Sequence, residues 1–328
     1  MDTPFRATCP PLDRAMKCYS EVGASSCARR AGVALKTLLA GVETSLWPEV
    51  AWRFSDLTRD GFPVELGFTS TDEDIRYVCE VAGPETDASL RLERALASLK
   101  SLGSPQCSLP LLESLTALQL NSSLGYGAWV SGRHRNNTDI FKLYVEVPEW
   151  PSADLSHFVN ETLGRPFVPP AQSLSLRMIG IELVTGRREL YFRAASLERW
   201  EVGRLMGHLD LSHRTAELLD LVDVVVQQPH RERFAGGQVG FSLSRREGHP
   251  HGTFSLFMIA RNVLGGDAKI RQRILEVAKV RGWPMDRYAA ISHPLVDRYG
   301  PRTHHQMVSF VIGSTGPPTL HIGLRPPV

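Results

Sequence analysis

The chain has 328 residues, of which 42% are hydrophobic and 22% charged, and its formal net charge is +2 at pH 7. These values are typical of a globular protein with a substantial core, and they give no indication of binding to nucleic acid or a membrane. No stretch approaches the roughly 18 apolar residues that a membrane span needs, and the N-terminal residues lack the apolar core of a signal peptide. Five scattered cysteines do not form a zinc or disulfide pattern, so we expect a cytoplasmic protein, monomeric or dimeric.

Residues 1–55 predict an N-terminal helical segment. Apolar residues recur at spacings of three and four from Asp13 to Leu39, and Gly41 is a typical helix stop. After this segment the periodicity changes from helical to alternating.

The first alternating stretch runs from Phe62 to Phe68 and places Glu65 and Gly67 on the face opposite its apolar residues. A second stretch, Ile75 to Val81, places Arg76 opposite its apolar residues. Residues 69–74 between them form a plausible hairpin loop, so the two stretches predict one β-hairpin.

Four further pairs of alternating stretches repeat this hairpin, and helical patterns lie between the pairs. The strands are expected at 126–133 with 140–147, 174–184 with 189–195, 238–244 with 253–261, and 307–312 with 320–324. The helices are expected at 87–102, 153–163, 197–209, 212–226 and 267–281.

In hairpin after hairpin one strand face is apolar and the other is polar. An open sheet would expose the polar face to bulk water, whereas a closed barrel turns it into a lumen, places the apolar face beneath helices and removes the edge strands. We therefore predict an α+β fold, a ten-stranded antiparallel closed barrel surrounded by helices and built from repeated αββα units. The expected single domain covers residues 1–328.

The polar face combines cations with hydroxyl groups. Arginine forks, lysine charges and tyrosine hydroxyls suit a polyanion such as diphosphate. The candidate diphosphate-binding residues are Arg76, Lys142, Tyr144, Arg187, Tyr191 and Arg193. For any one of them, a solvated charge on an exposed sheet face is an equally good interpretation; the recurrence over several hairpins favours a site.

The run Asp60-Gly61-Phe62-Pro63-Val64-Glu65, followed by Ile75-Arg76-Tyr77 and Glu80, resembles the first repeat of the dimethylallyltryptophan synthase group of ABBA aromatic prenyltransferases. The resemblance is strong over about the first third of the chain and is one of pattern afterwards. It implies the prenyltransferase barrel, and an enzyme of secondary metabolism that transfers a prenyl group from dimethylallyl or geranyl diphosphate to an indole or other aromatic acceptor.

The resemblance also implies roles for single residues. Glu65 matches the acidic residue that accepts the proton of the acceptor, and Arg76 matches the first diphosphate-binding arginine. Lys142 with Tyr144 matches a lysine–tyrosine pair of the second repeat. In the third repeat Arg187 and Tyr191 match, but Glu189 stands where the family has a lysine.

The later repeats depart further from the family. Ser255 and Phe257 stand where it has a polar residue and a tyrosine, and Ser309 and Phe310 provide no tyrosine. We assign Trp129, Ser255 and Phe257 to the acceptor and prenyl pocket, because aromatic faces stabilise an allylic cation and exclude water. For Glu65, an ion pair with Arg76 across the hairpin is the alternative to a catalytic role.

A metal site is not expected, although five histidines invite one. No carboxylate or cysteine stands at ligand spacing from them, and the family's resemblance implies direct binding of diphosphate by side chains; a contribution from Mg²⁺ is left open. The histidines concerned are His249, His251, His293, His304 and His305.

Three functions agree with these observations. The first is prenylation of an aromatic or indole acceptor, and the second is prenylation of a peptide or guanidine side chain by the same fold. The third is non-catalytic binding of a small anionic or amphipathic ligand in the lumen. The missing tyrosines favour the third function, whereas Glu65, Arg76 and Lys142 favour catalysis.

Overall fold

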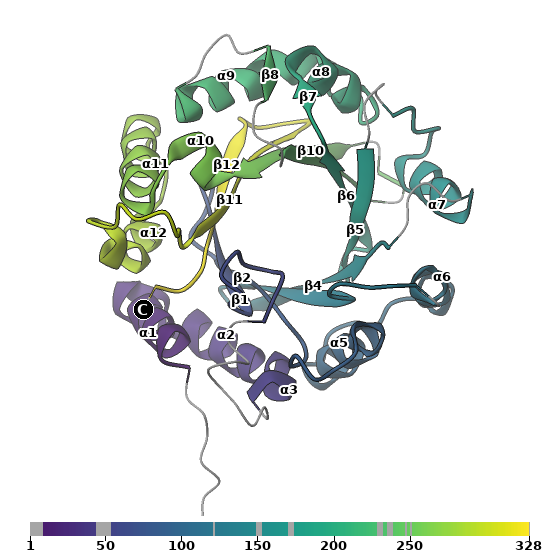
Figure 1. The fold of residues 1–328 in the computed structure, drawn as a ribbon, viewed down its shortest axis with the longest axis horizontal. Helices are drawn as coiled ribbons and strands as arrows, with labels where there is room; N and C mark the ends of the chain where they lie inside the picture. The colour runs from purple at the N-terminus through teal and green to yellow at the C-terminus, as the bar shows by residue number, and fades with distance from the viewer. Residues whose placement is uncertain are drawn as a thin grey trace, which may run out of the picture.

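The computed structural model describes residues 9–43, 54–120, 122–148, 153–169, 174–227, 232–234, 239–246, 248–249 and 251–327. Ten antiparallel strands close into a barrel in the order β1-β12-β11-β10-β9-β6-β5-β4-β3-β2 (Figure 1). The strands are β1 Val64–Thr69, β2 Ile75–Cys79, β3 Ala128–Arg135, β4 Thr138–Glu146, β5 Leu174–Glu182, β6 Arg187–Ala194, β9 Val239–Arg245, β10 Gly252–Ile259, β11 His305–Gly313 and β12 Thr319–Leu324. The predicted closed barrel is confirmed.

Alternation along each strand separates the outer face from the lumen. In β10, for example, Phe254 and Leu256 are fully buried on the outer face, while Ser255 and Phe257 line the lumen. Burying such apolar side chains stabilises the barrel by roughly 1.5–3 kcal/mol for each one. The polar face can therefore turn inward without leaving apolar surface in water.

The barrel closes where β1 pairs with β12. The register aligns Leu66 with Leu324 and Phe68 with Ile322. Ser70 and Leu320, 250 residues apart in sequence, extend the seam, because the Leu320 amide donates to the Ser70 hydroxyl over 2.9 Å. This closure leaves neither β1 nor β12 with an exposed edge.

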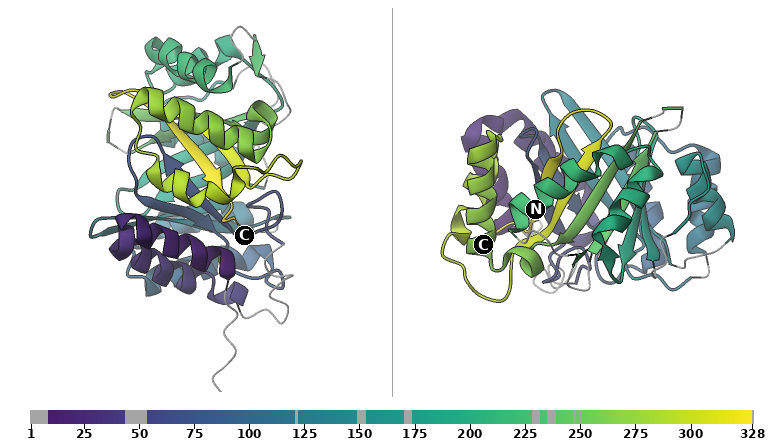
Figure 2. Two further views of the ribbon diagram at one scale, coloured as in Figure 1. Left: turned by 90° about the vertical axis from the view of Figure 1, so that its left-hand side faces the viewer. Right: turned by 90° about the horizontal axis from the view of Figure 1, so that it is seen from above.

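Helices surround the barrel on all sides, as Figures 1 and 2 show. The helices are α1 Pro10–Tyr19, α2 Ser25–Leu38, α3 Ala40–Glu43, α5 Arg91–Ser101, α6 Leu109–Gln119, α7 Ala153–Leu163, α8 Arg199–Gly207, α9 Thr215–Val226, α10 Ala260–Leu264, α11 Asp267–Arg281 and α12 Asp286–Ile291. In the described part of the chain no helix combines the length and apolar character that crossing a bilayer requires.

The helical layer contains α6, α10 and α12, which were not expected, and two expected helices differ in their course. The N-terminal helix is broken into α1 and α2, because Gly23 adopts a φ of 85° that ends regular helix; residues 1–8 and 44–53 of the predicted segment lie outside the described residues. The helix expected from residue 197 begins at Arg199, because Leu197–Glu198 (β7) pairs with Arg233–Phe234 (β8) in a separate small sheet.

Candidate functional site

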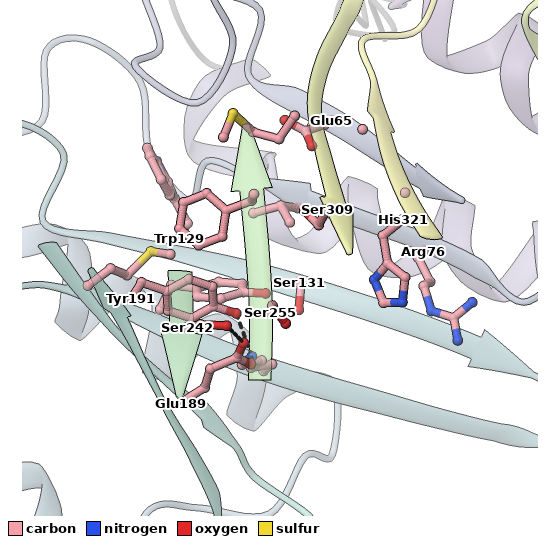
Figure 3. Close-up of a pocket in the computed structure, with 18 of the residues that line it drawn as sticks. Glu65, Arg76, Trp129, Ser131, Glu189, Tyr191, Ser242, Ser255, Ser309 and His321 are labelled. Atoms are coloured by element: carbon pink, nitrogen blue, oxygen red, sulfur yellow. Dashed lines mark hydrogen bonds and ion pairs between the residues drawn. The ribbon is translucent and has the colours of Figure 1, made fainter. Parts of the chain in front are cut away.

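The barrel encloses a cavity of about 780 Å³ that is lined by side chains from all ten strands. Because neighbouring strands run in opposite directions, the start of one strand lies beside the end of the next. We call the end of the lumen that holds Glu65, Trp129 and Arg193 the acceptor end. The opposite end, with Arg76, Arg187 and His321, is called the donor end, and Figure 3 shows Glu65 well separated from Arg76 and Glu189.

Glu65 lies on β1 with its side chain in the lumen, as predicted. Its carboxyl group has no hydrogen-bond or ion-pair partner among the residues that the structure describes. It lies so close to Gly323 on β12 that a methyl group there would overlap it. Burial without a compensating cation raises the pKa of Glu65 to about 8. Glu65 is therefore mostly protonated at pH 7, and only its minor ionised form can accept a proton.

Arg76 does not form the alternative ion pair with Glu65. The strand register places Gly67, not Glu65, opposite Arg76. The Arg76 guanidinium instead forms a two-pronged ion pair with Asp72, with Nη2 2.8 Å from Oδ2. Although partial burial acts in the other direction, the hydrogen bonds and charge of Arg76 hold the pKa of Asp72 well below its usual range. Arg76 is thus held at the donor end and Glu65 is left free.

His321 is a donor-end residue that the sequence analysis did not assign to the site. It projects from β12 beside Arg76, as Figure 3 shows. Burial, with the Arg76 charge as the next cause, lowers the pKa of His321 to about 4, so the imidazole is neutral at pH 7. Its place in the lumen followed from strand alternation, but its approach to Arg76 depends on the β1–β12 closure.

Lys142 and Glu189 form an ion pair in the wall of the lumen between the two ends. The Lys142 ammonium also donates to the Tyr191 hydroxyl over 2.8 Å and lies 5.0 Å and 5.1 Å from the ring centroids of Tyr144 and Tyr191. Gly180, between them on β5, leaves the space that the lysine stem occupies. The predicted lysine–tyrosine cluster is therefore assembled, with a carboxylate added to it.

The ionised state of Glu189 depends on this partner. Burial acts to raise the pKa of Glu189, but the Lys142 charge and the hydrogen bonds from Lys142 and Ser242 outweigh it and lower the pKa to about 2. Burial acts to lower the pKa of Lys142, and the nearby Glu189 charge outweighs this and raises it. Both groups are charged at pH 7.

Arg187 lies two residues from Glu189, at the donor end. Its guanidinium donates to the Ser244 hydroxyl over 2.6 Å and to the Thr253 hydroxyl. These neutral partners orient the guanidinium without cancelling its charge, which suits it to an anionic ligand.

Arg193 lies at the acceptor end, whereas the predicted role in diphosphate binding would require it at the donor end. It stands near the end of β6 and faces the acceptor end, whereas Arg187 stands at the start of the same strand. An irregularity in β5 between Leu176 and Met178 turns Arg177 into the same part of the lumen. Within the described residues neither guanidinium has a hydrogen-bond or ion-pair partner, so both are available to a ligand there. Strand direction could have assigned Arg193 to this end, but the irregularity at Arg177 has no sequence signal.

Trp129 lines the acceptor end, as predicted, and the surrounding network fixes its indole. The indole N–H donates to Glu80 over 2.9 Å, and the Tyr126 ring stacks on it with centroids 3.8 Å apart. Glu80 itself is fully buried and forms an ion pair with Arg91 at 2.9 Å. Glu80 therefore positions the aromatic wall beside Glu65.

Ser255 and Phe257 also line the lumen, as predicted. The Phe257 ring lies 6.3 Å from the Tyr191 ring and fills the space above Gly240, where a methyl group would overlap it. Phe257, Tyr191 and Tyr144 thus form an aromatic surface between the two ends of the lumen. Ser255 and its partner Ser242 contribute hydroxyl groups to the same part of the wall, because Ser242 pairs with Tyr191 across β9 and β6.

The histidine pair outside the lumen has a structural role in the described residues. Asp267, at the start of α11, accepts from the backbone amides of His304 and His305 and from the imidazole of His305 over 2.7 Å. The His305 ring continues the chain of contacts to the Tyr288 hydroxyl at 2.9 Å. This network fixes the start of β11 to the helical layer.

Comparison with solved structures identifies the fold. A 6-dimethylallyltryptophan synthase from Micromonospora olivasterospora, solved with DMASPP and Trp, superposes with a TM-score of 0.74 at 22% identity, covering 97% of this chain and 98% of that one. A 5-dimethylallyl tryptophan synthase from Streptomyces coelicolor, also solved with DMASPP and Trp, gives a TM-score of 0.78 at 15% identity over 97% and 96% of the two chains. The prenyltransferase PriB gives 0.73 at 16% identity over 97% and 96%. No family model and no curated protein sequence matches the chain. The chain therefore has the prenyltransferase barrel fold, as its first repeat led us to expect.

Proposed function

We propose that this chain transfers a prenyl group from dimethylallyl or geranyl diphosphate to an indole acceptor inside the barrel. The observation that carries the proposal is that a carboxyl group and a set of cations lie in different parts of one lumen. The half-buried carboxyl group of Glu65, without a partner among the described residues, lies at one end, and Arg76 lies towards the other (Figure 3). Lys142 and Arg187 line the lumen on the Arg76 side as well. The aromatic surface lies between the two ends.

The donor end suits the leaving group. When the bond between the allylic carbon and the diphosphate oxygen breaks, the oxygen keeps the electron pair and negative charge grows on the diphosphate. Arg76, Lys142 and Arg187 are cations held in place by hydrogen bonds or ion pairs, so they stabilise this charge without reorganising. Tyr144, Tyr191 and Phe257 face the allylic cation with aromatic surfaces, which stabilise it and exclude water.

The acceptor end suits proton removal. The indole ring attacks the allylic carbon and forms a carbon–carbon bond, which leaves a positive charge on the ring. Glu65, in its carboxylate form, then accepts the ring proton and restores aromaticity. The positively charged ring is a far stronger acid than a carboxyl group with a pKa of about 8, so transfer of the ring proton to ionised Glu65 is favourable.

Arg177 and Arg193 specify the acceptor further. Both face the acceptor end without an acidic partner among the described residues, and arginine binds carboxylates with paired hydrogen bonds. We assign them to a carboxylate on the acceptor, which makes tryptophan or another indole carboxylic acid the preferred class. Two of the solved structures with this fold contain tryptophan, which agrees with this assignment.

The described residues contain no group of three or more side chains of the kind that hold a metal ion, so the proposal assigns no residue to a metal. Diphosphate binds directly to cationic side chains. Assays with EDTA and with added Mg²⁺ measure any contribution of the ion.

Turnover tests the proposal. Purified protein is incubated with dimethylallyl or geranyl diphosphate and with tryptophan, tryptamine or an indole-free peptide, and diphosphate release and product mass are followed. We expect release that depends on tryptophan and falls about 100-fold or more in Glu65→Gln and in Arg76→Ala. Glu217→Gln and Arg165→Ala remove surface ion-pair partners and serve as matched controls.

A non-catalytic lumenal binder is the second candidate function. The Lys142–Glu189 ion pair favours it, because a carboxylate partly cancels the charge of a cation assigned to diphosphate. Binding of a prenyl diphosphate without release of diphosphate under any acceptor would support this candidate. Turnover with the peptide alone would instead support prenylation of a peptide side chain.

A further inference from the structure

The Lys142 ammonium group already has several partners within the protein. Its ammonium contacts the Glu189 carboxylate and the Tyr191 hydroxyl and faces two aromatic rings. The Lys142 and Glu189 side chains are only 18% and 17% exposed, and this exposure is to the lumen. A bound diphosphate must therefore compete with Glu189 for the same ammonium group.

Glu65 shows what happens to a carboxyl group in this lumen without a cation. Burial alone brings its pKa to about 8, whereas Glu189, beside Lys142, has a pKa of about 2. If a diphosphate binds the Lys142 ammonium group, the positive charge of Lys142 no longer keeps Glu189 ionised, and a polyanion becomes a neighbour of Glu189. Both changes favour the protonated form.

We propose that Glu189 takes up one proton when the donor diphosphate binds to Lys142, so that the lumen exchanges an internal ion pair for a neutral carboxyl group beside the polyanion. This inference rests on the proposed function. The Lys142–Glu189 contact is broken, a Lys142–phosphate contact forms, and the proton comes from solvent. The Glu189 O–H group formed in this way can donate a hydrogen bond to a phosphate oxygen. It does so at the position where the family that the sequence resembles has a lysine.

The other groups around Glu189 do not replace Lys142 as the partner that keeps its carboxylate ionised. Ser242 of β9 donates to the Glu189 carboxylate, and Tyr191, on β6 with Glu189, has a pKa raised well above its usual range, mainly by burial. Arg187 of β6 is the nearest remaining cation on the wall, but it is directed to Ser244 and Thr253 and would itself bind the diphosphate. Glu182 of β5 adds a further acidic side chain to the same lumen.

His321 is the competing proton acceptor. It faces the donor end across the lumen, among the charges of Arg76, Glu189, Asp72 and Arg133. An arriving polyanion would raise its pKa as well. The experiment must therefore separate Glu189 from His321.

Calorimetric titration of the protein with dimethylallyl thiolodiphosphate, without acceptor, measures the exchanged protons. Titrations at pH 7.5 in HEPES and in Tris, which differ in ionisation enthalpy, give the number of protons taken up per ligand. At this pH the ligand is almost fully ionised, because the last pKa of a phosphate monoester is about 6. The Glu65→Gln background removes the other carboxyl group that titrates near this pH.

We expect uptake of about one proton in Glu65→Gln and in Glu65→Gln/His321→Gln, and close to none in Glu65→Gln/Glu189→Gln. Because the bound state holds more protons, the affinity in Glu65→Gln should fall by up to tenfold per pH unit between pH 7.5 and 9, and Glu189→Gln should make it nearly independent of pH. Thermal unfolding of each variant verifies that it is folded.

Binding without proton uptake would overturn this inference and leave the proposed donor site intact. Uptake that disappears with His321→Gln and survives Glu189→Gln would also overturn it, in favour of the histidine. Absence of binding in every folded variant, at any pH, would contradict the donor site itself and with it both proposals.

Discussion

The two ends of the lumen place the same kind of side chain in opposite electrostatic states. Glu65, at the acceptor end, has no cation beside it among the described residues, and burial raises its pKa to about 8. Glu189, towards the donor end, is equally enclosed but contacts Lys142, and its pKa falls to about 2. The barrel wall therefore does not determine the charge of a lumenal carboxyl group; its nearest cation does.

The largest expected effect concerns the base at the acceptor end. With donor saturating, kcat/KM for the acceptor should rise with pH, because only the ionised form of Glu65 accepts a proton. Between pH 6 and pH 8 the rise should approach about 50-fold, since a group with a pKa of about 8 is about 1% ionised at pH 6 and half ionised at pH 8.

The matching measurement uses Glu65→Gln, whose residual activity should lose this dependence. A wild-type profile that is flat from pH 6 to pH 8 would show that Glu65 is not the base, or that it is ionised before the acceptor arrives.

The next effect removes the cation from the other carboxyl group. Lys142→Met leaves Glu189 buried without its partner and should lower the free energy of unfolding at pH 7 by about 2–3 kcal/mol, a discounted value for a lumen-facing pair. Lys142→Met/Glu189→Met should regain most of this loss, because no charge is left uncompensated. Denaturant unfolding of these two variants and of Glu189→Met completes the double-mutant cycle. If Lys142→Met and the double variant lose the same free energy of unfolding, the two side chains are not coupled.

A smaller effect concerns the two arginines of the acceptor end. Arg177→Gln and Arg193→Gln should each raise the KM for tryptophan by roughly tenfold, which corresponds to one charge-assisted hydrogen bond of about 1.5 kcal/mol. The KM for tryptamine, which lacks the carboxylate, should change little. Parallel losses for both acceptors would indicate that the arginines shape the pocket rather than bind the carboxylate.

The smallest expected effect is on stability. Glu65 has a raised pKa in the folded chain, so its protonated form stabilises the fold below pH 4.5, and this contribution is lost as the pH rises towards 8. Glu65→Gln, which cannot ionise, should therefore have a Tm close to that of the wild type at pH 5 and a few degrees higher at pH 8.5. Glu217→Gln, on the protein surface, should show no such divergence. A constant Tm difference across this range would contradict the raised pKa.

Strand alternation predicted much of this arrangement. It placed Glu65, Arg76 and Lys142 on one face, and the barrel brings all three into the lumen. It could not pair Lys142 with Glu189, because the two residues are on β4 and β6, and only the register across β5 places them face to face over Gly180. Contacts that cross a strand depend on register, which alternation does not specify.

The helices were less evenly predicted. Helix α7, Ala153–Leu163, and helix α11, Asp267–Arg281, have the expected bounds. Helix α11 ends at Gly282, whose φ of 66° is typical of a helix stop. Helix α6, Leu109–Gln119, was not predicted, although Leu111, Leu115 and Leu118 stand at the helical spacings of four and three. The short α12 contains only six residues, too few for a periodic pattern.

The seam between β1 and β12 also affects how the protein reaches its active form. The residues that join the first and last strands of the barrel, Ser70 and Leu320, are 250 residues apart in sequence. During synthesis, β1 therefore has no partner strand on one side until β12 has been made. Glu65 lies on β1 and touches Gly323 on β12, which means that the enclosed lumen around Glu65 forms only when the barrel closes. A nascent chain would expose an open strand edge until then, and such edges pair readily with other chains.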